Sequence, residues 1–439
     1  MQEKQSGGAV SKAPEPTDGG AETPLEEGET RASAASAAAT ARRVDVAIVG
    51  GGLVGASLGA ALAPVMAREG LEVAVIEAAA LPPAAEDTTW QPSFDARASA
   101  IAAGSAAHFE SLGVWQAMAE QASPISLIHV SERGRLGTTR LRADELGVEA
   151  LGYVIPNAWM GRVLHRRLGQ LALDWHCPAR VEAIAPIAGG HRLELSDGEV
   201  IEAGLTVLAD GGRSGLKEAL GIDSREAPYD QVALICNVAV SHPHRGVAYE
   251  RFTPQGPMAL LPLPGQAMEL VWTHSAGAEQ QRLALSDRAF LDQLQEAFGD
   301  RAGAFLKVGK RHAYPLSLIT ARETVRPGLA VLGNAAHALH PVAGQGFNLA
   351  LRGVMDLVES IEAGLAEGRA PGDRATLADF EARREADQRN VIRFSDGLIR
   401  VFGIDQPLLS RARAAGLVGL NLLGPLRRSL ARRAMGRQR

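Results

Sequence analysis

The apolar positions of the chain first become regular near residue 43. Val44–Val49 is a short apolar run, as expected of a strand that is buried on both faces. Leu53–Arg68 is rich in small residues and predicts a helix, and Leu71–Ile76 is a second apolar strand. These segments have the order and length of a strand–helix–strand unit, which favours an α/β fold.

The next part of the chain has a mixed pattern that ends in an antiparallel sheet. A helix is expected at about 158–172, and strands at 192–196 and 199–208 flank the turn residues Ser196-Asp197-Gly198. Between about 230 and 275, turn residues separate four extended runs, which predicts a separate β lobe. The runs are Val232–Val240, Val247–Phe252, Met258–Leu263 and Met268–Thr273.

The last third of the chain predicts one more buried strand and then helices. The strand is expected at 329–333, and a long amphipathic helix is expected over Asn348–Glu367. From about residue 376 to the end the pattern is helical.

The first 42 residues differ in composition from the rest. They are rich in Ala, Glu, Gly, Pro, Ser and Thr and contain no aromatic residue, so we interpret 1–42 as a disordered tail. A mitochondrial targeting peptide is the less favoured alternative, because the tail carries several Glu and few Arg. Ala47–Ala67 is uncharged and long enough to span a bilayer, but its five glycines favour a strand–turn–helix.

Composition and charge exclude several classes of protein. The chain has 439 residues, a net charge of -5 and 22% charged residues, which suits a globular protein and gives no indication of nucleic acid binding. Its two cysteines, Cys177 and Cys236, lie far apart, so neither a disulfide framework nor a metal site is indicated.

A glycine-rich turn follows the first strand. The residues Gly50, Gly52 and Gly55 fit the pattern G-x-G-x-x-G between a strand and a helix, and the acid Glu77 ends the next strand. Such a turn lets the backbone approach a pyrophosphate at the positive end of a helix. Glu77 can accept a hydrogen bond from a ribose hydroxyl and would repel a 2′-phosphate. The pattern predicts a site for FAD or NAD, and not for NADP; a turn used only for packing is the alternative.

Two later segments narrow this prediction. One is Asp210-Gly211, and the other runs from Gly333-Asn334 through His337 and Pro341 to Gly344-Gln345-Gly346-Phe347-Asn348. With the glycine-rich turn, they resemble in order and spacing the three sequence marks of the single-component flavoprotein aromatic hydroxylases. Much of that family has Asp at position 334. Asn can still accept a hydrogen bond there, so FAD binding is expected to survive the change.

Further segments resemble the hydroxylases of ubiquinone biosynthesis, and among them the 2-polyprenyl-6-methoxyphenol hydroxylase branch. They are Phe94–Ile101, Gly113-Val114-Trp115, His129–Gly134, Glu250–Pro257, Ala313–Leu316 and Arg383-Arg384 with Asp387. The resemblance covers residues 43–439.

The resemblance implies a Rossmann-like three-layer FAD-binding domain, an antiparallel β-sheet substrate domain and a C-terminal helical segment. We expect the FAD-binding domain at 43–120, 155–225 and 310–370. The substrate domain would comprise 121–154 and 226–309, and the helical segment 371–439. The strands Met258–Leu263 and Met268–Thr273 could wall a channel for a prenyl tail, although core packing explains the same residues.

The resemblance also implies the chemistry. NAD(P)H would serve as a transient electron donor to FAD, and O2 would supply a hydroxyl placed para to the oxygen of a polyprenylated phenol. Arg97 would contact the cofactor, with a surface ion pair as the alternative. Gly344–Asn348 would face the flavin at a helix start, and Pro341 would shape that loop. His337 and His340 are weak candidates for proton transfer, and His337 is interpreted instead as a structural, hydrogen-bonded histidine.

The C-terminus is basic and partly apolar. No acidic residue follows Asp405, and the apolar run Ala414–Leu423 lies between arginines. This pattern predicts a peripheral attachment to the inner face of the cell membrane, in a cytoplasmic protein. A packed terminal helix, or a contact within a homo-oligomer or a multi-enzyme complex, is an equal alternative.

Three other functions are left open by the sequence. They are a sister hydroxylase acting on another carbon of the same ring, a flavin reductase of isoprenoid double bonds, and a nonenzymatic FAD-containing assembly subunit.

Overall fold

The computed structural model describes residues 41–80, 97–135, 137–340, 344–403 and 407–436. Ala39–Arg439 form one compact unit, and the description below concerns that unit. Residues 1–40 of the predicted tail, the segment Phe94–Ala96 and Pro341 lie outside the described residues, whereas Arg42, the last residue of the predicted tail, is the first residue of a strand.

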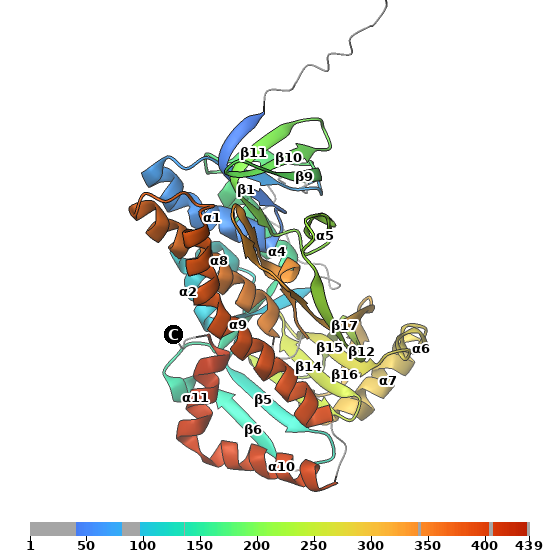
Figure 1. Cartoon of the computed structure of the whole chain (residues 1–439). Helices are drawn as coiled ribbons and strands as arrows, with labels where there is room; N and C mark the ends of the chain where they lie inside the picture. The colour runs from blue at the N-terminus through green and yellow to red at the C-terminus, as the bar shows by residue number, and fades with distance from the viewer. Residues whose placement is uncertain (1–40, 81–96, 136, 341–343, 404–406, 437–439) are drawn as a thin grey trace, which may run out of the picture. The chain divides into compact units, whose positions relative to one another are not determined.

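An eight-stranded mixed sheet contains the strand that leads into the glycine-rich turn (Figure 1). Its main path is β18-β19-β11-β1-β2-β8, and the links from β19 to β8 are parallel. The strands of this path are β1 (Arg42–Val49), β2 (Val73–Ile76), β8 (Asp174–His176), β11 (Val200–Leu208), β18 (Val325–Arg326) and β19 (Leu329–Val331). The antiparallel strands β9 (Val181–Ile187) and β10 (Gly190–Leu195) extend it from β11.

Both faces of this sheet are buried, as the apolar runs predicted. Val46 and Ile48 point to a core shared with α1 (Leu53–Glu69), α4 (Asn157–Leu168) and α8 (Gln345–Ala366). Ala47 and Val49 point to the other core, which includes a residue of the short helix α5 (Leu216–Ala219). Burying each large aliphatic side chain contributes about 1.5–3 kcal/mol, so the continuous apolar strands fix a layered structure.

A second, nine-stranded sheet carries the predicted antiparallel runs. Its main path is β20-β17-β12-β15-β14-β13-β5-β6, and β16 pairs with β12. The strands are β5 (Leu127–Glu132), β6 (Thr138–Arg142), β12 (Ser224–Val240), β13 (Val247–Thr253), β14 (Gly256–Pro262), β15 (Ala267–Ser275), β16 (Phe305–Val308), β17 (His312–Ala321) and β20 (His337–Ala338). The four strand predictions between 230 and 275 are confirmed, and β12 begins eight residues earlier than its predicted start at Val232.

One face of the nine-stranded sheet is covered by α7 (Asp287–Phe298), which follows the short helix α6 (Glu279–Leu283). Leu234, Met258 and Leu270 pack there against Phe290 and Leu294. Met258 and Leu270 of the expected channel strands therefore belong to a core between sheet and helix, which is the core-packing alternative for that face.

A small three-stranded sheet and two helices connect these layers. It has the order β3-β7-β4, with β3 (Ala98–Ala102), β4 (Ser123–Ile125) and β7 (Gly152–Pro156). The helices are α2 (Ala103–Ser111) and α3 (Trp115–Ala119). Strands β5 and β6 join the nine-stranded sheet, and the proposed domain boundaries stay a prediction.

The C-terminal pattern is helical, as predicted. The helices are α9 (Arg374–Gly403), α10 (Pro407–Leu422) and α11 (Gly424–Ala434), and α10 and α11 lie along the β5–β6 hairpin (Figure 1). The Thr139 hydroxyl donates a 2.7 Å hydrogen bond to the Leu417 carbonyl, and Arg413 forms a 2.7 Å ion pair with Glu132. In the described part of the chain, no helix combines the length and apolarity that a membrane span requires.

Candidate functional site

Three of the predicted loops meet at one edge of the eight-stranded sheet. Gly50 follows β1, Asp210 follows β11, and Gly333 follows β19, and these three parallel strands are direct neighbours. The carboxyl ends of parallel strands lie at the same edge, so segments about 120–160 residues apart in the chain come together there. The structure thus brings together the three sequence marks.

The glycines of the first loop are required by close backbone contacts. Gly50 has φ +102°, and a Cβ there would lie 2.8 Å from the backbone of Ala209 and Asp210. A Cβ on Gly55 would lie 1.8 Å from the Gly50 carbonyl oxygen. Gly52, by contrast, has nothing within 4 Å of its Cβ position, and it precedes the first turn of α1, which contains no acidic residue. The loop is closely packed at Gly50 and Gly55 and open at Gly52, and the open side suits the approach of a phosphate.

Glu77 lies directly after β2 and holds the same loop. Its Oε2 accepts a 2.7 Å hydrogen bond from the Gly51 amide, and its Oε1 accepts one from the Ala79 amide. Each carboxylate oxygen can accept a second bond, so a ribose hydroxyl can still be bound. Two residues that the sequence did not indicate support the loop as well. His165 of α4 lies 2.7 Å from the Gly51 carbonyl, and Trp175 packs beneath Gly51.

Asp210 organises the second loop through its own backbone. Its carboxylate accepts hydrogen bonds of 3.0 and 2.9 Å from the amides of Gly212 and Ser214. Gly211 and Gly212 both have positive φ, near +74° and +73°, which this tight turn requires. Asp210 therefore shapes the loop, and its contact with the cofactor stays a prediction.

The third loop joins β19 to the start of α8. Gly333 has φ +62° and packs against Val54 of α1, and Asn334 beside it is exposed at the sheet edge. Gly344 precedes α8 in the left-handed conformation, and a Cβ there would lie 3.0 Å from the Ala100 side chain. In the described residues no side chain caps α8 and no acid lies in its first turn, so its amides are available to an electron-rich group.

Asn348 ties this loop to β3. Its Oδ1 accepts a bond from the Ala102 amide, and its Nδ2 donates to the carbonyls of Ala100 and Gly344, at 2.7–2.9 Å. Gln345 is buried and Gly346 is open on its Cβ side. The side chain of Asn348 is thus used to fix the loop, and the loop's backbone is the part that can face a cofactor.

Arg97 lies immediately before β3, beside the nine-stranded sheet. Its guanidinium lies 5.2 Å from the ring centre of Tyr314. The next residue, Ala98, donates a 2.8 Å hydrogen bond from its amide to Oε1 of Glu269. Burial raises the pKa of Glu269 to about 7, with the Ala98 amide and Arg97 opposing that shift. The segment that the resemblance places beside the flavin is therefore anchored on the sheet.

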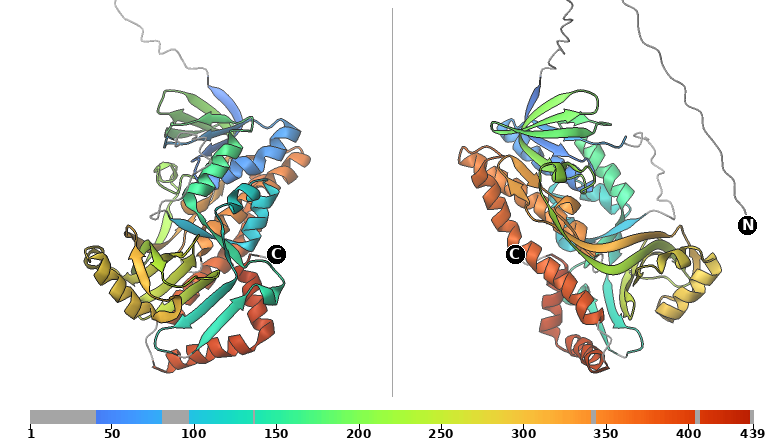
Figure 2. Two further views of the ribbon diagram at one scale, coloured as in Figure 1. Left: turned by 180° about the vertical axis from the view of Figure 1, so that it is seen from behind. Right: turned by 45° about the vertical axis from the view of Figure 1, so that its right-hand side comes forward.

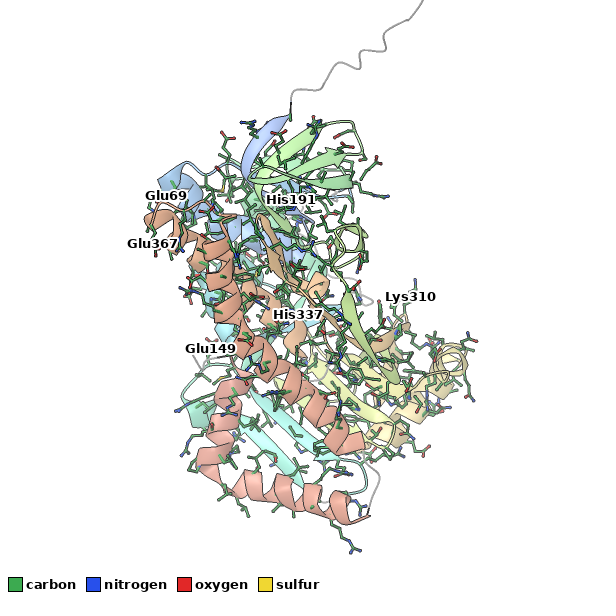
Figure 3. The ribbon with its side chains drawn as sticks, viewed as in Figure 1. Glu69, Glu149, His191, Lys310, His337 and Glu367 are labelled. Carbon is green, nitrogen blue, oxygen red and sulfur yellow. The ribbon has the colours of Figure 1, made fainter. Side chains whose placement is uncertain are left out.

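The two histidines are buried and neutral. His337 is labelled in Figure 3, and its burial, with Arg384 and Arg352 nearby, lowers its pKa to about 3. Burial lowers the pKa of His340 to about 4. Neither ring nitrogen of His337 has a hydrogen-bond partner among the described residues, so the hydrogen bonds expected of it are missing there. Such weakly basic groups are poor candidates for proton transfer near neutral pH.

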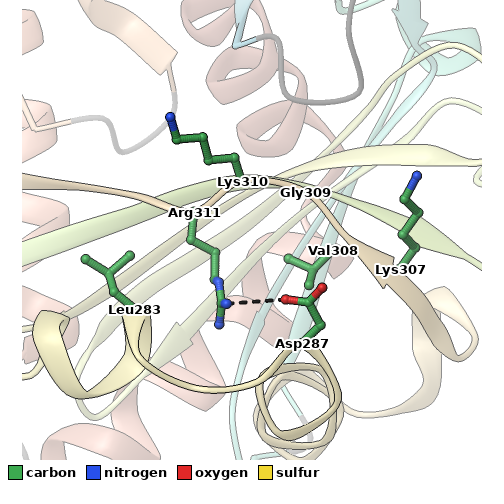
Figure 4. Close-up of a pocket in the computed structure, with 7 residues that line it drawn as sticks. All are labelled: Leu283, Asp287, Lys307, Val308, Gly309, Lys310 and Arg311. Atoms are coloured by element: carbon green, nitrogen blue, oxygen red, sulfur yellow. Dashed lines mark hydrogen bonds and ion pairs between the residues drawn. The ribbon is translucent and has the colours of Figure 1, made fainter.

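A separate cavity of about 570 Å³ lies beside the turn between β16 and β17 (Figure 4). Arg311 and Asp287 form an ion pair of 3.3 Å in it, and the side chains of Lys307 and Lys310 project in different directions (Figure 4). None of the three loops contributes a residue to its lining, so we do not assign the cofactor to this cavity.

The geometry of the loops fits FAD. The open outer side of Gly52, the uncapped starts of α1 and α8, and the carboxylate of Glu77 supply the groups that a dinucleotide needs. Residues 43–395 match the family model described as FAD binding domain. The chain belongs to this family.

The similarity to relatives covers nearly the whole chain. It is 38% identical over 396 residues to ubiquinone hydroxylase UbiL of Rhodospirillum rubrum, with 89% of both chains covered. It is 32% identical over 404 residues to 3-demethoxyubiquinol 3-hydroxylase of Escherichia coli, covering 90% of this chain and 100% of that protein. Members of the family therefore include ring hydroxylases, and this chain is an FAD-dependent monooxygenase.

Solved structures show the same fold. The p-nitrophenol 4-monooxygenase PnpA of Pseudomonas putida aligns with a TM-score of 0.72 and 17% identity, over 91% of this chain and 100% of that one. The PqsL protein of Pseudomonas aeruginosa, solved with 2-aminobenzoylacetate, aligns with a TM-score of 0.69 and 22% identity, over 86% of this chain and 100% of that one. The predicted fold class, an α/β FAD-binding fold of the aromatic hydroxylase type, is confirmed.

Proposed function

We propose that this monooxygenase hydroxylates the ring of a polyprenylated phenol in ubiquinone biosynthesis. The step proposed is conversion of 2-polyprenyl-6-methoxyphenol to 2-polyprenyl-6-methoxy-1,4-benzoquinol, with NAD(P)H and O2 as co-substrates. The observation that supports the proposal is that the three loops predicted to bind FAD meet at one edge of a sheet, in a chain whose relatives are named as ubiquinone hydroxylases.

Bound FAD would supply the redox chemistry, and the protein would hold and shield it. Gly50–Gly55 and Glu77 would bind the adenosine and pyrophosphate, and Asp210 and Asn334 would lie near the rest of the cofactor. The amides at the start of α8 would stabilise negative charge on the flavin ring. Arg97 would be held over it by Tyr314 and the Ala98–Glu269 hydrogen bond.

The second candidate is a sister reaction at another carbon of the same ring. The name of the Escherichia coli relative, a 3-hydroxylase of demethoxyubiquinol, supports it directly. Hydroxylase names among the relatives favour ring oxidation over reduction of isoprenoid double bonds or a nonenzymatic assembly role.

We also propose that the enzyme attaches to the inner face of the cell membrane through the junction of α10 and α11. Three leucines there are more than half exposed: Leu422 at 77%, Leu423 at 57% and Leu426 at 55%. Arg428 and Arg432 are exposed on the adjoining helix. Exposed leucines next to arginines suit a surface of anionic lipid, where a polyprenyl substrate resides. Membership of a multi-enzyme complex or a homo-oligomer is the alternative use of this surface.

The proposed reaction is tested by recording the visible spectrum of the protein and by identifying the product. The purified protein is expected to be yellow, to oxidise NAD(P)H in air with a short-chain 2-prenyl-6-methoxyphenol, and to form the para-benzoquinol identified by NMR. Hydroxylation at another carbon would support the sister reaction. A protein that cannot be loaded with FAD, or that forms only peroxide with every ring phenol, would contradict the proposal.

A further inference from the structure

The nine-stranded sheet has one closed face and one partly open face. Side chains that point toward α7, such as Leu234, Leu260 and Leu270, are fully buried. Four of the apolar residues that alternate with them are only half-buried, whereas Ala233 and Phe252 on the same face are buried. The four are Ile235 on β12, Ala259 and Leu261 on β14, and Val271 on β15. Apolar side chains at the centre of a sheet are usually covered, so these four partly exposed residues are available to contact an apolar group.

The open face is the one that meets the cofactor segments. Glu269 lies on it and accepts the Ala98 hydrogen bond, and Tyr314 lies on it under Arg97. Asn348 then links β3 to the start of α8. A ligand on this face would therefore lie between the sheet and the loop that we assign to the flavin ring.

One carboxyl group, besides that of Glu269, lies in a row with three of these apolar residues. Glu250 on β13 is directly opposite Ala259, which is opposite Val271, which is opposite Ile235. These four residues form one row across adjacent strands, each about 4.8 Å from the next. Ala259 is small, so the carboxyl group is not covered by its neighbour across the strands.

Glu250 differs from Glu269 because its carboxyl group has no hydrogen-bond partner among the described residues. Glu269 accepts a backbone hydrogen bond, whereas the Glu250 carboxyl has no hydrogen bond or ion pair to any described residue. Its side chain is half-buried, and burial raises its pKa to about 8. At neutral pH it is mainly an uncharged acid, which can both donate and accept a hydrogen bond.

We infer that Glu250 recognises the ring hydroxyl of the phenolic substrate, while Ile235, Ala259 and Val271 contact the ring and its apolar substituent. This inference rests on the proposed function and adds the residue that would choose the orientation of the ring. A phenol offers one hydroxyl on an apolar body, and the row offers one carboxyl on an apolar surface. A site built to bind a hydroxyl strongly rejects the analogue that lacks it, because its own polar group is then left unpaired.

The experiment compares the binding of two ligands to the wild-type protein and to its variants. The ligands are a short-chain 2-prenyl-6-methoxyphenol and the same molecule without the ring hydroxyl, and binding to the FAD-loaded protein is measured by calorimetry. The variants are Glu250→Ala and, as the matched control, Glu296→Ala on α7, where Glu296 is 81% exposed. The wild type and the control are expected to prefer the phenol by about 10–100-fold.

In Glu250→Ala that preference is expected to fall to about twofold or less, with affinity for the hydroxyl-free ligand nearly unchanged. Glu250→Gln keeps the size and the ability to donate and accept, and is expected to retain part of the preference. It also serves if the alanine variant does not fold, as judged by its FAD content and circular dichroism.

An unchanged preference in both Glu250 variants would overturn the inference and leave the proposed function intact. A wild-type protein that holds FAD but binds no prenylphenol would instead overturn the proposed function, and this inference with it. The two failures are thus separated by the wild-type measurement alone.

Discussion

Gly50 shows how one residue type can be required by the packing of a loop. Its positive φ and its contact with the backbone of Ala209 and Asp210 leave no room for a side chain. The backbone of β11 cannot move aside without breaking its pairing with β1. The sequence indicated this glycine through its spacing, and the structure adds the reason, which is the second loop lying against it.

Gly50→Ala is therefore expected to lower FAD affinity at least tenfold, because the clash displaces the loop that faces the phosphates. Flavin absorbance relative to protein absorbance after gel filtration measures the effect. The control is Gly70→Ala at the end of α1, which has φ +69° but nothing within 4 Å of its Cβ position. It is expected to lose about 1 kcal/mol of stability and to keep FAD. Equal flavin content in the two variants would contradict this account.

The raised pKa of Glu250 predicts that the stability of the protein depends on pH. Its folded pKa of about 8 is raised above the ordinary value of 4.5, so the folded protein keeps a proton that the unfolded chain releases. The protonated Glu250 contributes its full stability below pH 4.5, and this contribution is lost as the pH rises toward 8. The loss is at most about 1.4 kcal/mol per pH unit, and solvent screening of this half-buried group reduces it. Relative to wild type, Glu250→Gln should gain stability from pH 5 to pH 8 in urea unfolding. A stability difference that does not change with pH would show that Glu250 is ionised in the folded protein.

Among the site residues, the sequence was more informative about loops than about side-chain partners. Glycine spacing predicted the first loop, because backbone geometry leaves a local signature, and the resemblance to the flavoprotein hydroxylases indicated the other two. His165 and Trp175 carry no such signature, since they reach the first loop only through the packing of α4 and β8. Glu250 and Glu269 could have been noticed as acids inside alternating apolar strands.

At the scale of elements, the start of β12 differs from expectation. The sequence predicted only Val232–Val240, whereas the strand begins at Ser224 and pairs with β17 along both parts (Figure 2). Its first half is polar and exposed, so no apolar alternation reveals it, and a register shift between Pro228 and Gln231 interrupts the pairing. Strand ends that depend on a partner far along the chain cannot be deduced from local pattern.

The attachment of α10 to the β5–β6 hairpin depends on a buried ion pair. The side chains of Arg413 and Glu132 are only 8% and 10% exposed, and they lie 2.7 Å apart. Arg413→Gln is expected to cost about 3 kcal/mol, because it leaves a buried carboxylate without its partner. Thermal unfolding measures the loss, and Arg411→Gln on the exposed side of α10 is the control.

The double variant with Glu132→Gln should recover part of that stability, since no buried charge remains. A double variant as unstable as the sum of the single ones would mean that the two side chains contribute independently.

At the scale of the whole molecule, the exposed leucines predict binding to anionic membranes. Vesicles containing phosphatidylglycerol are expected to carry the wild-type protein upward in a flotation gradient, and neutral vesicles to carry much less. Replacing Leu422, Leu423 and Leu426 by Ser should abolish flotation. Leu306→Ser is the control, because Leu306 is 61% exposed on β16 and belongs to another part of the surface. Flotation that survives the triple replacement would place the contact elsewhere.

The order of the parallel strands has a consequence for protein synthesis. The three strands that present the proposed FAD-binding loops come from residues 42–49, 200–208 and 329–331, and the helix that completes the proposed site begins at Gln345. A ribosome adds roughly 5–20 residues per second, so the first loop waits many seconds for its last neighbour. A nascent chain that ends before β19 lacks one wall of the site, and the vitamin-derived cofactor can be captured only when translation is nearly complete.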